Sequence, residues 1–161
     1  HLPVPMAEWL TQGVGGLKDV LKFLAERARS KDVIKNALLR EMRDNLQLLS
    51  HRNNATLDVK ALIAQLSARA MAEAFSANYT FKKLANNKKV PATLILNDRQ
   101  KRYVDWDAER LVVSIEGKIH DLKNMLIIYP NIFKAPVNLT ARLDNLYYQL
   151  LLLSLLIYSD K

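Results

Sequence analysis

The chain has 161 residues, of which 50% are hydrophobic, and a formal net charge of +8. This length suits one domain with a real core. The chain has only 4 glycines and 5 prolines, so few residues interrupt regular structure. Leu and Ala are abundant, which favours helix over strand. The chain has no cysteine, which excludes disulfides and Cys-ligated zinc or iron–sulfur sites and fits a cytoplasmic location.

Residues 1–16 predict an irregular lead-in, because two prolines come early and Gly13, Gly15 and Gly16 follow. A short helical turn fits residues 7–12. We expect residues 17–161 to form a single helical-bundle domain. The chain begins with His1 rather than Met, so we expect a piece of a larger protein, and we see no signal peptide in it.

Apolar residues at intervals of three and four predict a helix over residues 17–52. Its middle, residues 25–32, is polar, so we expect either one long helix or two collinear helices with a restart near Ser30. Asn54 or Thr56 is expected to cap a second, Ala-rich helix over residues 57–85. Its small side chains would let a neighbouring helix approach closely.

The helical pattern is lost between residues 86 and 104, where Pro91 stops the second helix. A connection of this length is unusual in a compact domain. It predicts a long crossover that packs on the bundle and serves a function or is only partly ordered.

Asp105 or Asp107 is expected to cap a third helix that ends at Pro130. Asn138 is expected to cap a fourth, whose leucines repeat at heptad spacing. The sequence therefore predicts an all-α, antiparallel four-helix bundle, with a long or broken first helix and a long crossover between the second and third helices.

The terminal stretch LYYQLLLLSLLIYSDK raises the question of a membrane anchor. Its apolar run is about 12 residues long, whereas a bilayer crossing needs about 20. Because it is apolar around most of its circumference, we expect this helix to be the most buried one. Any face of it that stays exposed would be an oligomer interface.

Candidate catalytic and metal residues are few. Glu116 and His120 share a helical face and are the weak candidates for a metal pair, although a solvent-facing pair is the simpler interpretation. Arg43 and His51 lie eight steps apart, about 80° around and 12 Å along a helix, so they do not converge on one phosphate as an RNase pair would. We find no Gly-rich phosphate loop and no nucleophile elbow, and predict no cofactor.

Asn45 and Asn145 both follow an Arg and an Asp inside apolar helices. If both point inward, they would pair across the bundle and set its register. Otherwise they lie at the core boundary, partly hydrated.

A basic segment between Lys82 and Arg102 carries most of the net charge, because seven cations in it face one acid, Asp98. Its cations are the candidate anion-binding residues: Lys82, Lys83, Lys88, Lys89, Arg99, Lys101 and Arg102. With Tyr79, Phe81 and Tyr103 beside it, the segment would suit nucleic acid, an anionic membrane surface or an acidic protein. A solvated loop is the plainer interpretation.

These features favour a non-enzymatic helical interaction or assembly module of a larger protein or complex. Its expected contacts are a protein partner or a second copy, through helices 57–85 or 139–158. One alternative is a nucleic-acid-binding or RNase-type protein that uses the basic segment. Another is a peripheral domain of a protein tethered to a membrane by residues before this chain.

Overall fold

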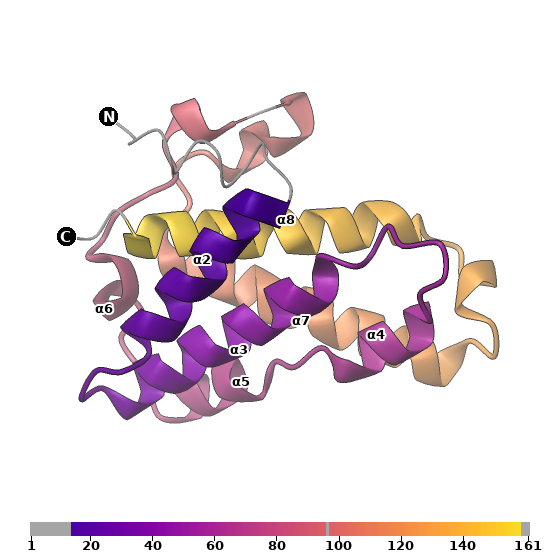
Figure 1. The fold of residues 1–161 in the computed structure, drawn as a ribbon, viewed down its shortest axis with the longest axis horizontal. Coiled ribbons are helices and arrows are strands. Elements are labelled where there is room, and N and C mark those ends of the chain that lie inside the picture. Colours follow the sequence, from indigo (N-terminus) through magenta and orange to yellow (C-terminus); the bar gives the residue numbers. More distant parts are fainter. Residues whose placement is uncertain (1–13, 96, 159–161) are drawn as a thin grey trace.

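The computed structural model describes residues 14–95 and 97–158 (Figure 1). Within these ranges the regular elements are all helices and there is no strand, which confirms the all-α prediction. The α-helices are α2 (Val14–Arg27), α3 (Val33–Leu49), α4 (Val59–Gln65), α5 (Arg69–Ser76), α6 (Lys82–Ala85), α7 (Ala108–Ile128) and α8 (Leu139–Tyr158). Three 3-10 helices lie between them: η1 (Ala92–Leu94), η2 (Asp98–Tyr103) and η3 (Ile132–Lys134). Most of the predicted lead-in, with its turn over 7–12, lies outside the described residues, but residues 14–16 are helical rather than irregular.

The predicted first helix consists of two helices that fold back on each other. α2 and α3 pack along their lengths (Figure 1). Asp32 caps α3 by accepting a hydrogen bond from the Lys35 N–H (2.9 Å). Asn36 holds the turn, since its amide donates to the Ser30 carbonyl (2.7 Å) and accepts from the Ser30 N–H (3.0 Å). The restart near Ser30 is confirmed, but the collinear arrangement is wrong because these bonds stabilise a reversal.

The predicted helix over 57–85 consists of three short helices, α4, α5 and α6. Asp58 caps the first of them by accepting a hydrogen bond from the Ala61 N–H (3.1 Å). Capping by Asn54 or Thr56 was therefore a wrong prediction. The Asn54 side chain instead accepts hydrogen bonds from the backbone and hydroxyl of Thr56 (3.0 and 2.8 Å) within the preceding turn.

The break between α4 and α5 contains neither Pro nor Gly and is stabilised by two side chains of α3. Asn45 donates to the Ser67 carbonyl (2.8 Å) and accepts from the Ser67 N–H (3.0 Å). The Glu41 carboxylate accepts from the N–H groups of Ala70 (2.9 Å) and Met71 (3.2 Å), at the start of α5. These bonds satisfy backbone groups that a helix start leaves without partners, so the chain stops and restarts helix here.

The ends of α5 and α6 use asparagines in the left-handed backbone region. Asn78 follows α5 with a φ of 53°, and Asn86 ends α6 with a φ of 48°. Asparagine adopts this conformation more readily than most residues with a side chain. Each of these asparagines turns the chain away from the axis of the preceding helix, so the segment does not continue as one helix.

The long crossover between α6 and α7 is closed on itself at its base and is hydrogen-bonded to α8 further along. At its base, the Val90 N–H donates to the Trp106 carbonyl (2.9 Å) and the Asp105 N–H donates to the Val90 carbonyl (2.9 Å). Further along, the Tyr148 hydroxyl of α8 donates to the Leu94 carbonyl (3.0 Å). The crossover forms the upper layer in Figure 1, across α8.

The last two helices begin as predicted. Asp107 caps α7 by accepting from the Arg110 N–H (2.9 Å), and the Asn138 side chain accepts from the Ala141 N–H (3.0 Å) at the start of α8. α8 contacts α2, α3, α6 and α7, and all of its residues from 148 to 157 are buried. This burial confirms the prediction for the Leu-rich terminal helix.

The arrangement of these helices differs in detail from the predicted four-helix bundle, which the structure does not confirm. α2 and α3 replace the predicted first helix, and α4, α5 and α6 replace the predicted second one. Within residues 14–95 and 97–158, no helix combines the length and the apolar character that a bilayer crossing requires.

Candidate interaction and anion-binding sites

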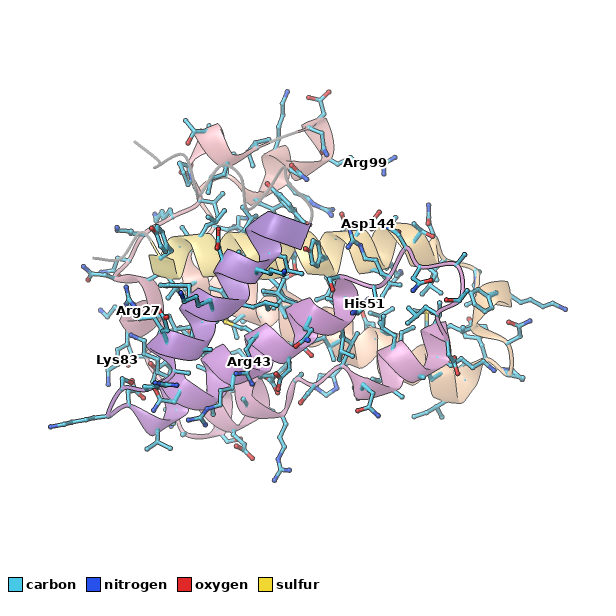
Figure 2. The ribbon with its side chains drawn as sticks, in the orientation of Figure 1. Arg27, Arg43, His51, Lys83, Arg99 and Asp144 are labelled. Atoms are coloured by element: carbon cyan, nitrogen blue, oxygen red, sulfur yellow. The ribbon has the colours of Figure 1, made fainter. Side chains whose placement is uncertain are left out.

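The seven predicted anion-binding cations are spread over three parts of the fold. Lys82 and Lys83 lie on α6, Lys88 and Lys89 on the loop after it, and Arg99, Lys101 and Arg102 on η2. In the view of Figure 2, Lys83 lies at the left of the molecule and Arg99 lies near the top, above α8. Lys83 and Arg99 are therefore well separated, and the seven cations are divided among these three parts of the fold.

On the Lys83 side, a cation and a tyrosine stabilise the cap of α3. The Lys83 ammonium lies 5.8 Å from the centre of the Tyr79 ring, and the Tyr79 hydroxyl donates to Asp32 (2.9 Å). Burial alone would raise the pKa of Asp32. Hydrogen bonds from the Lys35 N–H and the Tyr79 hydroxyl, with the charges of Lys83 and Lys35, outweigh burial and lower that pKa.

On the η2 side, Arg102 belongs to a pocket that the sequence did not predict. This cationic pocket has a volume of about 270 Å³ and lies between η2, α7 and α8. Its lining residues are Arg102, Lys118, Leu122, Arg142 and Asn145. Each of these three elements thus contributes one cation to the pocket.

The three cations of the cationic pocket influence one another. Partial burial lowers the pKa of the Lys118 ammonium, and the charges of Arg102 and Arg142 lower it further, while Asp121 acts in the opposite direction. Arg102 donates a hydrogen bond to the Tyr103 hydroxyl (2.9 Å). Among the described residues, no carboxylate forms an ion pair with any of the three.

One helical turn from the cationic pocket, Gln149 is buried between the same two helices. The Ser114 hydroxyl of α7 donates to its Oε1 atom (3.1 Å). Its Nε2 atom has no hydrogen-bond partner among the described residues. The contact between α7 and α8 is therefore polar along two successive turns.

A second, larger hollow lies between α3 and the α4–α5 segment, with a volume of about 740 Å³. Glu41 lies in it, and its carboxylate accepts hydrogen bonds from the Ser67 hydroxyl (2.7 Å) and from the start of α5. Burial raises the pKa of Glu41, although these hydrogen bonds oppose the rise. Because its acceptor oxygens are used by α5, Glu41 serves as a helix cap.

Of the two expectations for Asn45 and Asn145, the pairing across the bundle is wrong, and Asn145 is partly buried, as the expectation of a core-boundary position had it. Asn45 is 1% exposed and binds the backbone of Ser67. Asn145 instead lines the cationic pocket. The two asparagines lie on different faces because α3 presents its polar face to the α4–α5 break and not to α8.

The weak metal candidates lie on α7. Glu116 is partly buried and His120 is exposed. The described part of the chain contains no group of three or more His, Cys, Asp or Glu side chains that would hold a metal ion. On α3, Arg43 forms an ion pair with Asp44 (3.0 Å), and Figure 2 shows His51 well separated from Arg43.

Large apolar side chains are exposed where α7 ends and η3 begins. We call Ile127, Ile128 and Phe133 the α7 tip, and their exposed fractions are 83%, 66% and 68%. Ile132, between them, is 1% exposed and anchors the segment in the core. Exposed apolar clusters of this kind mark interaction surfaces more often than isolated exposed residues do.

Lysines surround the α7 tip. The Lys60 ammonium donates to the Pro130 carbonyl (3.2 Å), and the Lys123 ammonium donates to the Ala64 carbonyl (2.9 Å). Lys134 follows Phe133 in the chain and is exposed. The tip is therefore an apolar surface with a cationic border.

Comparison with protein-family models, with curated proteins and with solved structures found no match for this chain.

Proposed function

We propose that the chain is a non-enzymatic helical interaction module of a larger protein or complex, and that the α7 tip is its contact surface. The observation that carries the proposal is the exposure of three large apolar side chains, Ile127, Ile128 and Phe133, within one short stretch of the chain. Burying one such side chain is worth about 1.5–3 kcal/mol. A partner that covers all three side chains would gain most of the binding free energy that a small interface needs.

The chemistry around the tip supports one kind of partner. Lys60, Lys123 and Lys134 border the apolar residues, so the partner should be a protein with an apolar pocket and an acidic rim. The net charge of +8 opposes self-association through the same face. We therefore favour a different, acidic protein over a second copy.

The two helical surfaces predicted from the sequence are less suitable. The apolar faces of α8 are covered by α2, α3, α6 and α7. The exposed apolar side chains of α4 and α5 are all alanines, namely Ala61, Ala64 and Ala72. Neither offers the large apolar anchors that dominate binding energy at interfaces.

We also propose that the module is organised as a four-helix bundle with one added helix. α3, α7, α8 and the α4–α5 segment would be the four members, and α2 would cover α3 and α8. The packing of α7 on α8 and of α3 on α5 supports this description. The α7 tip projects from the end of this bundle (Figure 1).

A non-enzymatic role is supported by what the buried polar groups do. Glu41 and Asn45 satisfy the backbone at the α4–α5 break. Ser154 donates to the Leu150 carbonyl within α8 (2.8 Å). The hydrogen bonds of each of these three side chains go to the backbone or a side chain of the fold, so each group stabilises the structure.

Site-specific photocross-linking tests the proposal. A photoreactive residue at Ile127 should give a defined adduct with one protein in the cells that make this chain. The matched control places the same residue at Ala72, which is exposed on α5. Identical adduct patterns from both positions would contradict the proposal, because contact would then not depend on the tip.

A further inference from the structure

The geometry points to a second site, independent of the interaction surface: the cationic pocket binds the phosphate group of a small phosphorylated molecule through Arg102, Lys118, Arg142 and Asn145. Of the seven cations of the basic segment, only Arg102 lines this pocket. Lys118 and Arg142 come from helices α7 and α8.

The neighbouring acids do not neutralise this pocket. Asp144, in the same turn of α8 as Arg142, is paired with Arg52 (2.6 Å). Asp98, on η2, is paired with Lys101 (2.9 Å). Asp121 influences Lys118 only through its charge. The three cations of the pocket therefore lack a counter-charge within hydrogen-bonding distance among the described residues.

Like charges held together destabilise a fold unless an anion joins them. The lowered pKa of Lys118 has this cause in part, since Arg102 and Arg142 both contribute to it. A phosphate monoester carries about −1.5 to −2 charges near neutral pH and offers three acceptor oxygens. It matches three cations better than a carboxylate, which carries one charge.

The donor set also suits a phosphate. Two guanidinium groups present planar pairs of N–H donors, and an ammonium adds a compact charge. Asn145 makes no hydrogen bond with another described residue, so its amide is available to a ligand. Leu122 forms an apolar wall, against which the uncharged part of a small molecule would lie.

The shape of the surface favours a small molecule over a nucleic acid. A volume of about 270 Å³ is close to the lower limit of small-molecule sites. A strand of nucleic acid would need a track of cations leading away from the pocket. Lys83 lies on another side of the molecule from Arg99 (Figure 2), and Lys101 is engaged by Asp98.

The test is a titration of the intact chain with inorganic phosphate, with acetate and with single-stranded RNA at constant ionic strength. Calorimetry gives the affinity, and NMR follows the side-chain amide of Asn145. The variant K118Q/R142Q removes two pocket cations. The control R29Q/K31Q removes two exposed cations from the α2–α3 turn and so matches the change in net charge.

We expect saturable phosphate binding that shifts the Asn145 amide. Each lost cation should weaken it about tenfold, whereas the control should bind like the unaltered chain, and acetate should bind more weakly. R102Q, on the exposed η2 element, repeats the test if the double variant fails to fold. Equal loss in the control, an unmoved Asn145 amide, or binding of RNA without binding of phosphate would each overturn the inference.

Discussion

The side-chain amide of Asn45 forms two hydrogen bonds with the backbone of Ser67, donating to its carbonyl at 2.8 Å and accepting from its N–H at 3.0 Å. It thereby completes the backbone hydrogen bonding of a residue that lies between two helices. Together with Glu41, it explains why an Ala-rich segment without Pro or Gly does not form one helix.

Replacing Asn45 by Ala should lower the free energy of unfolding by about 2 kcal/mol, because it leaves both backbone groups of Ser67 without partners. Urea denaturation measures the change. Gln47→Ala, at an exposed position of the same helix, should alter stability by less than about 0.5 kcal/mol. Equal effects of the two substitutions would show that the Asn45–Ser67 pair contributes nothing specific.

Glu41 should make stability depend on pH in a definite direction. Burial raises its pKa in the folded chain, so the stabilisation that it contributes is present below the ordinary glutamate pKa and is lost as the pH rises through the raised value. The stability of the unaltered chain relative to Glu41→Gln should therefore decrease with rising pH in that window. Unfolding free energies of both chains at several pH values test this, and an increasing difference would contradict it.

Asp32 should show the opposite dependence. Its pKa is lowered in the folded chain, so its stabilisation is present above the ordinary aspartate pKa and is lost as the pH falls through the lowered value. Asp32→Asn keeps an acceptor for the cap and removes the charge. The variant should be less stable near neutral pH, and the difference should disappear in acid. A difference that is the same at every pH would exclude this role for the charge.

The crossover should depend on one tyrosine of α8. Tyr148→Phe removes the hydrogen bond to the Leu94 carbonyl, and we expect a loss of about 1 kcal/mol with faster amide exchange over residues 92–104. Tyr147→Phe is the matched control, because Arg52 stacks on its ring and no described residue binds its hydroxyl. If both substitutions change exchange in the crossover equally, the Tyr148 bond is not what holds it.

Features that depend on neighbouring residues could be predicted from the sequence. Asp107 and Asn138 cap their helices through N–H groups three residues ahead, so local pattern is sufficient. The burial of α8 follows from its apolar circumference. The reversal near Ser30 was visible as a polar interruption, but its direction depends on side-chain bonds across the turn.

Features that depend on distant pairs could not be predicted. Glu41 and Asn45 act on residues more than 20 positions away, and nothing local marks Ser67 as a break. The cationic pocket depends on how α7 aligns with α8, which places Lys118 beside Arg142. A local signal does mark the α7 tip: Ile127 and Ile128 fall outside the three-and-four spacing of apolar residues on their helix, as exposed residues do.

The most direct test of the central claim is the affinity of the cross-linked partner, once purified, for the unaltered chain and for I128S/F133S. These substitutions remove two of the three apolar anchors at exposed positions, so the fold should be preserved. We predict a loss of affinity of about a hundredfold, which corresponds to nearly 3 kcal/mol. An unchanged affinity would show that the α7 tip is not the interaction surface and would contradict the proposed function.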